Sequence, residues 1–218
     1  MKISILCSSQ SHPIWGALES WRNSNSSTHD IQIVNEAKDL MGGQLLFLVA
    51  CSEIVTEATR RKFSKSLVIH ASDLPEGRGW SPLVWSILSG KENLVMTLLE
   101  ADDRVDTGDI WHKLSFSIEK WLTFDEITKV VNEKQIELMN WAVNNFDNAT
   151  PTPQEFVLPV TMKRRSPMDS ELDPNKSLAD QFDLLRICDP LRYPARFSFR
   201  GRNFKLILLP LEGDSVED

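Results

Sequence analysis

The segment from His70 to Gly79 (HASDLPEGRG) holds the side chains best suited to chemistry in this sequence. His70 ends an apolar run, and an imidazole is the side chain that exchanges a proton most readily near neutral pH. A lone histidine is more often structural or exposed, but ligands of open α/β sheets bind beyond the carboxyl ends of strands. Gly77 and Gly79 permit close approach of the backbone to a ligand, and Arg78 between them can hold an anion.

A second polar loop, Asp102 to Asp109 (DDRVDTGD), follows another apolar run. A solvated acidic loop is the ordinary interpretation of such a segment. A calcium loop is excluded, because the spacing of the acids and the terminal glutamate are missing. A carboxylate at the end of a neighbouring strand can orient an imidazole and stabilise its protonated form. We therefore pair Asp106 with His70 as the candidate site.

An apolar sheet must position these two loops, and short apolar runs that are typical of buried strands supply one. Helical candidates lie between the runs, so the order predicts an α/β sheet with crossover helices. Strands are expected over residues 2–7, 31–35, 45–50, 67–70 and 94–100, and helices over residues 14–24, 53–65 and 82–89.

The second half of the chain begins with a capping box at Thr123–Glu126, which predicts a long amphipathic helix to Phe146 that covers the sheet. Polar, proline-containing loops and a hairpin follow. The expected parts are loops at 148–153 and 163–176, a helix at 178–187, and strands at 195–199 and 204–209 joined by a turn at 200–203. We assign residues 1–150 to the main α/β domain and 151–218 to a small C-terminal subdomain.

Composition excludes several classes of function. The 218 residues carry a net charge of −7, which disfavours a nucleic-acid partner. The longest apolar run, residues 45–51, is too short to cross a membrane, and the amino terminus reads as a strand rather than a signal peptide. The cysteines Cys7, Cys51 and Cys188 are too few for a disulfide framework or a zinc site. We expect a cytoplasmic protein with buried thiols and no metal.

Both loops together resemble the folate-dependent formyltransferase family. The matching positions are His70, Ser72, Leu74, Pro75, Arg78 and Gly79, then Asp106, Gly108 and Ile110. Either half alone is a weak signal, but both at this separation are specific, and the match extends over roughly residues 45–115. The resemblance implies a Rossmann-like core with a mostly parallel twisted sheet, followed here by a small C-terminal region with a β-hairpin.

The resemblance also implies a reaction. The formyl donor is 10-formyltetrahydrofolate, a substrate amine attacks the formyl carbon, and a histidine and an aspartate manage proton transfer. His70, Asp106 and Ser72 take the catalytic positions. The segment Cys51–Ile54 (CSEI) is similar to a folate-binding loop of the family. The donor contacts implied in this way are Ser52, Ile54, Ala101, Asp102, Asp103 and Val105.

One position departs from the family pattern. Two residues before the histidine the family carries an asparagine that binds the developing oxyanion, whereas this chain has Val68. Loss of one oxyanion donor typically slows a reaction by about 10²–10³. Another donor (Ser72, Ser52 or a backbone N–H) takes over, or a protonated His70 holds the oxyanion, or the protein is a weak or degenerate enzyme. We favour the first two explanations together.

The C-terminal region bears on the acceptor. It is short and acidic, which disfavours the tRNA branch, and residues 164–169, 181–187 and 189–195 resemble the short C-terminal region of sugar N-formyltransferases. The segment HASDLPEGRGWSP in particular resembles members that act in pathways to nonulosonic acids of surface glycans. The implied acceptor is a nucleotide-linked amino-deoxysugar. Its expected contacts are Arg78, Gly79, Trp80, Arg164 and Arg165.

Other interpretations stay open at this point. The pair Arg164–Arg165 is equally compatible with a solvated loop. For Trp85 we prefer a core position, and for Tyr193 we prefer packing of the C-terminal hairpin onto the main domain. The acceptor can be another amine, such as an amino acid or a ribonucleotide amine. The chain can also be a folate- or sugar-binding protein that has lost catalysis together with the asparagine. Finally, Phe197, Phe199 and Phe204 can form either a homodimer patch or the buried face of the hairpin itself, and we prefer the latter.

Overall fold

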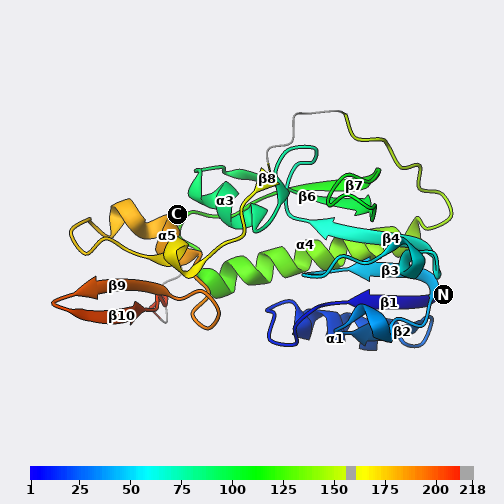
Figure 1. Cartoon of the computed structure of the whole chain (residues 1–218), viewed down its shortest axis with the longest axis horizontal. Coiled ribbons are helices and arrows are strands. Elements are labelled where there is room, and N and C mark those ends of the chain that lie inside the picture. The colour runs from blue at the N-terminus through cyan, green and yellow to red at the C-terminus, as the bar shows by residue number, and fades with distance from the viewer. Residues whose placement is uncertain (156–160, 212–218) are drawn as a thin grey trace.

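The computed structural model describes residues 1–155 and 161–211. Its centre is a six-stranded sheet with the strand order β2-β1-β3-β4-β6-β7 (Figure 1). The strands are β1 (Lys2–Leu6), β2 (Asp30–Val34), β3 (Gly43–Leu48), β4 (Phe63–His70), β6 (Asn93–Glu100) and β7 (Ile110–Ser117). The five strands expected from the apolar runs are all present in this sheet.

The sheet has a parallel and an antiparallel part. The pairs β1–β2, β1–β3 and β3–β4 are parallel, whereas β4–β6 and β6–β7 are antiparallel. The expectation of a mostly parallel α/β sheet is confirmed. Because β6 runs against β4, its carboxyl end at Glu100 pairs with Leu67, three residues before His70. The loop after β6 must therefore turn back to reach the histidine.

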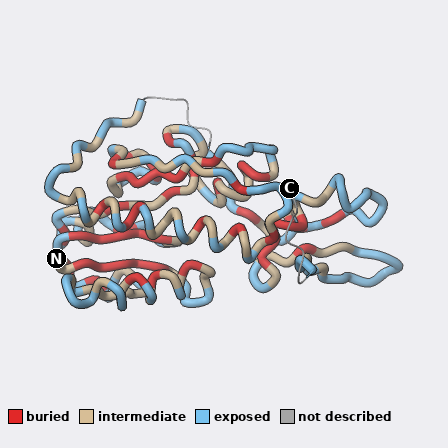
Figure 2. The backbone as a smooth tube through the Cα atoms, turned by 180° about the vertical axis from the view of Figure 1, so that it is seen from behind, coloured by how far each residue is buried: buried red, intermediate tan, exposed pale blue. Residues whose placement is uncertain are grey.

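One face of the sheet is covered by α1 (Trp15–Asn25) and α4 (Phe124–Asn144), and α3 (Pro82–Leu88) completes the packing. The capping box is present, since Glu126 accepts hydrogen bonds from the backbone N–H and the hydroxyl of Thr123. Ile127, Leu138 and Met139 of α4 are almost completely buried against the sheet. The buried side chains of these strands and helices form the largest apolar cluster, and Figure 2 shows that the buried residues follow the central strands.

The structure differs from the expectations for the main sheet at two places. The helix expected over residues 53–65 is wrong, because α2 spans only Glu57–Arg60 and Phe63 already begins β4. Phe63 is buried in a second apolar cluster on the other face of the sheet, so burial overrides helix formation there. Strand β7 was not expected at all. A β-bulge opposite Leu98 and Leu99 shifts its register and disguises the alternation of the sequence.

The C-terminal region has its own small apolar cluster. It contains η2 (Pro167–Ser170), η3 (Ala179–Gln181), α5 (Phe182–Arg186) and a hairpin of β9 (Ala195–Phe199) and β10 (Arg202–Leu206). The hairpin is confirmed, whereas the helix expected over 178–187 is divided between η3 and α5. Figures 1 and 2 show the hairpin projecting beyond the main body with most of its surface exposed.

The hairpin aromatics are not a closed buried face. Phe199 and Phe204 remain 47% and 40% exposed, although the rings of Phe197 and Phe204 stack at 5.3 Å. All three cysteines are free thiols, with Cys7 and Cys188 buried and Cys51 half-buried. Burial raises the pKa of the Cys7 and Cys51 thiols. Within residues 1–155 and 161–211, no helix is both long and apolar enough to cross a bilayer.

Candidate active site

His70 is the last residue of β4 and only 8% exposed. Its Nε2 atom lies 2.9 Å from the carbonyl oxygen of Gly77, and its Nδ1 atom lies 3.5 Å from Oδ1 of Asp106. Since a carbonyl can only accept, Nε2 is the protonated nitrogen of this contact. The imidazole thus lies between the two motif loops, with Nε2 at the Gly77 carbonyl and Nδ1 near the Asp106 carboxylate.

Asp106 reaches His70 because the loop after β6 folds back over the end of β4. The residue is 8% exposed, and its backbone has a φ of 58°, in the left-handed region. Its Oδ2 atom accepts a hydrogen bond of 2.9 Å from the backbone N–H of Gly79. One carboxylate therefore contacts the imidazole through one oxygen and the glycine-rich loop through the other.

Ser72 supports the loop that follows His70. Its hydroxyl donates to the carbonyl oxygen of Glu76 at 2.9 Å, and its own carbonyl accepts from Thr97 Oγ1 at 2.6 Å. Ser72 is 6% exposed. Because its only proton is already donated to a backbone oxygen, the geometry favours a supporting role for Ser72 over the role of oxyanion donor.

Gln154 and residues 161–165 also lie at the site, although they come from the C-terminal side, and the motif pattern did not include them. Gln154 accepts a hydrogen bond of 2.7 Å from Arg78 Nη2, and its amide nitrogen donates to the carbonyls of Asp106 and Gly108. Strand β8 (Thr161–Met162) pairs with β5 (Arg78–Gly79). Gln154 lies just after the loop expected at residues 148–153 and belonged to no expected element, and nothing in its sequence indicates a partner so distant along the chain.

The acceptor residues proposed from sequence fall into two groups. Arg78 and Gly79 lie beside the His70–Asp106 pair, and Trp80 follows them with its side chain 41% exposed and the guanidinium of Arg164 over its ring at 4.7 Å. Arg165 differs, because it is 6% exposed and its guanidinium donates to the Ile187 carbonyl and the Ser170 hydroxyl. This placement assigns Arg165 to the packing of the C-terminal region, and we do not retain it as an acceptor contact.

Trp85 and Tyr193 pack against residues 163–165. Trp85 is half-buried on α3, and its indole N–H donates to the Lys163 carbonyl at 2.9 Å. Tyr193 similarly packs under the guanidinium of Arg165 at 5.6 Å. Both side chains thus fasten the returning segment, in keeping with the packing roles preferred for them.

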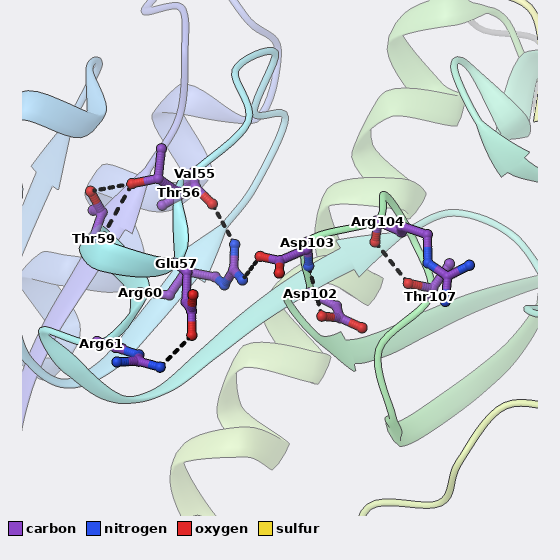
Figure 3. Close-up of polar contacts among 10 residues, drawn as sticks. All are labelled: Val55, Thr56, Glu57, Thr59, Arg60, Arg61, Asp102, Asp103, Arg104 and Thr107. Carbon is purple, nitrogen blue, oxygen red and sulfur yellow. Dashed lines mark hydrogen bonds and ion pairs between the residues drawn. The ribbon is translucent and has the colours of Figure 1, made fainter.

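The two loops proposed to bind the folate donor lie side by side and are joined by Arg60 (Figure 3). Arg60 donates from Nη1 to the carbonyl of Val55 at 2.6 Å and from Nη2 to Asp103 Oδ1 at 2.5 Å. Its side chain is 12% exposed, whereas that of the adjacent Arg61 is 77% exposed and pairs with Glu57. Arg60 therefore holds loop 51–55 against loop 101–105.

These loops offer the surface that a flat heteroaromatic ring requires. Ile54 and Val105 are 71% and 57% exposed, one on each loop. Cys51, Val68 and Ala101 are half-buried and pack against the same apolar cluster. Ser52 is exposed, with its backbone N–H bonded to Ser8, and Asp102 caps the N–H of Asp103. The residues present thus fit a pterin-like group, with Val68 as part of its apolar floor.

The described residues contain no group of three or more His, Cys, Asp or Glu side chains placed to hold a metal ion.

Comparison with known proteins identifies a matching family and similar structures. The formyl transferase family model matches residues 1–143. Among curated proteins, methionyl-tRNA formyltransferase of Rickettsia typhi is 31% identical over 125 residues, which are 57% of this chain and 40% of the relative. The chain thus spans about 40% of the length of such relatives.

Several solved structures share the fold. A methionyl-tRNA formyltransferase from Clostridium thermocellum has a TM-score of 0.81 at 22% identity, covering 98% of this chain and 95% of its own. HypX from Aquifex aeolicus in complex with tetrahydrofolic acid scores 0.77 at 20% identity, covering 95% of this chain and 37% of its own.

A sugar N-formyltransferase from Shewanella sp. has a TM-score of 0.68 at 18% identity and covers 95% of this chain and 97% of its own. These likenesses confirm the Rossmann-like formyltransferase fold. With the family model matched over the whole main sheet and α4, the chain belongs to the formyl transferase family.

Proposed function

We propose that this protein is an N-formyltransferase that moves a formyl group from 10-formyltetrahydrofolate to an amine. The observation that carries the proposal is the buried contact between His70 and Asp106, closed by the backbone N–H of Gly79. It unites the two halves of the family's motif although they come from antiparallel strands. Buried, paired ionisable groups beside a glycine-rich loop are typical of reaction sites.

The donor supplies a formyl group bound to a nitrogen. In the transfer, a bond forms between the acceptor nitrogen and the formyl carbon, and the bond from that carbon to the donor nitrogen breaks. The acceptor amine loses one proton and the donor nitrogen gains one. His70, oriented by Asp106, is the group proposed to relay that proton. Ile54, Val105 and the floor around Val68 are proposed to hold the donor's ring.

The proposed acceptor is an amino sugar linked to a nucleotide. Arg78 supports this choice, since it forms no ion pair with any described residue and its buried Nε atom has no hydrogen-bond partner. An arginine in that state suits a phosphate or carboxylate. Trp80 offers a partly exposed aromatic face for a sugar or base. Full-length structural matches include both a sugar N-formyltransferase and a methionyl-tRNA formyltransferase, so the choice of a sugar rests on Arg78 and Trp80 and not on these likenesses.

A second candidate function is binding of folate or sugar without turnover. Val68 favours it, because no side-chain donor stands at the family's oxyanion position. The contact between His70 Nε2 and the Gly77 carbonyl also favours binding without turnover, because this hydrogen bond must break before Nε2 can contact a substrate. The intact His70–Asp106 pair favours catalysis.

Turnover separates the two functions. Purified protein is incubated with 10-formyltetrahydrofolate and a panel of nucleotide-linked amino sugars, free amino acids and ribonucleotide amines, and release of tetrahydrofolate is followed. We expect release with an amino-sugar nucleotide and its loss in His70→Ala. Measurable folate binding with no release from any acceptor would support the binding protein instead, and full transfer by His70→Ala would refute the role of His70.

Three broader assignments accompany this function. Residues 1–150 are proposed to form the catalytic domain and residues 151–218 a small C-terminal subdomain. The reaction is proposed to occur in the cytoplasm, on precursors of a surface polysaccharide, without nucleic acid or membrane as a partner. Finally, the exposed Phe199 and Phe204 suit an interface between two copies of the chain, so we propose a homodimer through the hairpin.

A further inference from the structure

We propose that Gln154 is a positioning residue that couples acceptor binding at Arg78 to the geometry of the His70–Asp106 pair; this inference rests on the proposed formyl transfer. Gln154 lies outside every motif of the family pattern described above. It is half-buried, and both ends of its amide are used. No other described side chain hydrogen-bonds both Arg78 and the loop of Asp106.

The carbonyl end of the amide orients Arg78. It accepts a hydrogen bond of 2.7 Å from Nη2, while Nε is buried without a partner. A neutral amide fixes the plane of a guanidinium without cancelling its charge, whereas a carboxylate at the same place would neutralise it. Gln154 thus leaves Arg78 both oriented and charged, as recognition of an anionic acceptor requires.

The amino end of the same amide holds the loop of Asp106. It donates to the carbonyls of Asp106 at 3.0 Å and Gly108 at 2.8 Å. Asp106 has a φ of 58°, and a non-glycine residue keeps such a backbone only where its surroundings enforce it. Gln154 supplies part of that constraint, and the Asp106 carboxylate lies 3.5 Å from His70 as a result.

A displacement of Arg78 is therefore transmitted to Asp106 through one rigid amide. The backbone N–H of Gly79, the residue after Arg78, donates to Asp106 Oδ2 and closes the ring of contacts. An acceptor bound at Arg78 would restrain this closed set of contacts and hold the Asp106 carboxylate close to the imidazole. Without an acceptor, the same contacts would be less restrained.

Kinetics of three variants test this coupling. Gln154→Leu removes both ends of the amide, and Gln154→Glu keeps an acceptor for Arg78 but can no longer donate to the two carbonyls. Glu155→Gln is the matched control, because Glu155 is the exposed neighbour. We expect Gln154→Leu to raise the acceptor KM and lower kcat, each about tenfold, which is within the usual range of coupling between sites. Gln154→Glu should lower kcat to the same extent and also raise the acceptor KM, because its carboxylate neutralises Arg78, and Glu155→Gln should change neither constant.

The Arg78→Ala background separates coupling from loss of folding. There, Gln154→Leu should still lower kcat but no longer raise the acceptor KM, because the group it orients is gone. An unchanged KM effect in that background would overturn the inference. So would a fall in kcat that matches the loss of folded protein, measured by thermal unfolding, at constant KM.

A readout without turnover keeps the inference independent of the proposed function. The chain has four histidines, and the NMR signals of the His70 side chain should shift in Gln154→Leu but not in Glu155→Gln. If the wild-type chain formylates no amine and the His70 signals still shift, the proposed function fails while the link from Gln154 to the pair stands. His70 signals that stay in place in Gln154→Leu would overturn the inference whatever the activity.

Discussion

Two backbone positions control the contact between His70 and its carboxylate partner. Gly79 and Asp106 both have positive φ values, 103° and 58°, and the N–H of the first donates to the carboxylate of the second. Beside them the side chains of Ser72 and Gln154 donate hydrogen bonds to backbone carbonyls of the two loops. The chemistry proposed for His70 therefore depends on residues whose own contribution is conformational.

Gly79→Ala tests this dependence. A Cβ atom at this position would lie 2.6 Å from the carbonyl oxygen of Met162, so β8 or the loop must shift. We expect a loss of about 3 kcal/mol in the free energy of unfolding, from strain and overpacking together, and a fall in kcat of at least about tenfold. Gly90→Ala is the control, because φ is also positive there but nothing lies within 4 Å. Equal losses in both variants would show that close packing at Gly79 is unimportant.

Val68→Asn restores the amide of the family pattern. Val68 lies on the half-buried floor beside His70, so an asparagine there can donate to the formyl oxygen at a modest loss of stability, about 1 kcal/mol. Since one oxyanion donor is worth about 10²–10³ in rate, we expect kcat to rise, by about tenfold or more. The measurement is steady-state kinetics beside thermal unfolding. A fall in kcat without a fall in stability would show that this position does not face the formyl group.

At the scale of elements, the residues of the proposed donor site lie on short loops and on α2 rather than on long helices. The four-residue α2 supplies Arg60, and the loops after β3 and β6 meet across it. Strand direction alone does not bring these loops together, because β3 is parallel to β4 whereas β6 is antiparallel to it, and the contacts of Arg60 link them. The loop after β1 lies at the same end of the sheet as the loop after β3, and it contains His12.

Arg60→Leu should weaken donor binding specifically. Loss of the bonds to Val55 and Asp103 frees two loops that are proposed to hold the donor's ring, and one charge-assisted hydrogen bond is worth about 1.5–3 kcal/mol. We expect the KM or Kd for 10-formyltetrahydrofolate to rise about tenfold or more, with the acceptor KM little changed. Arg61→Leu serves as control, since its side chain is exposed. An equal effect of both variants would contradict the assignment of these loops.

His12 makes the stability of the β1–α1 connection depend on pH. Burial, followed by the charge of Arg192, lowers the pKa of His12 from 6.5 to about 4. Its Nδ1 atom accepts from the Ile14 N–H at 3.3 Å, which requires the neutral ring. Between these two pH values the unfolded chain binds a proton that the folded chain does not, so stability falls as the pH drops from about 6.5 to about 4.

The variant His12→Asn keeps an acceptor at this place and does not titrate. Over that pH interval it should lose less stability than the wild type, by a difference on the order of 3 kcal/mol. Urea unfolding at several pH values measures the difference, and effects of the other histidines cancel in the comparison. Parallel curves for the two proteins would show that His12 titrates normally in the folded chain.

At the scale of the whole molecule, the C-terminal region contributes residues to the site and also leaves apolar side chains exposed on the hairpin. Gln154 and residues 161–165 return to the glycine-rich loop, whereas the hairpin extends beyond the amino-terminal end of α4 (Figure 1). Exposed apolar side chains gather along and after the hairpin, among them Phe199, Phe204, Ile207, Leu209 and Leu211. Several exposed apolar side chains in one region are candidates for an interaction surface.

The double variant Phe199→Glu, Phe204→Glu tests the proposed homodimer. Both residues lie on the hairpin, away from His70, so the charges should separate the two copies and leave the active site intact. Sedimentation at micromolar concentration should give a dimer for the wild type and a monomer for the variant, with kcat preserved. A wild-type monomer, or a dimer that persists in the variant, would contradict an interface through the hairpin.

The sequence by itself determined the family, the α/β class and the residues of the two motif loops. The family follows from the resemblance of the two motif loops, and the α/β class follows because apolar strands, a capping box and glycine-rich turns are encoded locally, within a few residues of the chain. The apolar runs located five of the six central strands, and Thr123 located the start of α4. His70 and Asp106 were paired correctly from their types and spacing.

Only the tertiary structure decided how the loops meet. Strand β6 is antiparallel to β4, so Asp106 reaches His70 through a loop that folds back, and no local pattern encodes strand direction. The role of Gln154 and the burial of Arg165 depend on contacts 76 and 22 residues apart along the chain. A bulge concealed β7, and burial of Phe63 shortened α2. Long-range packing selects among the conformations that local sequence permits, so these features appear only in the folded chain.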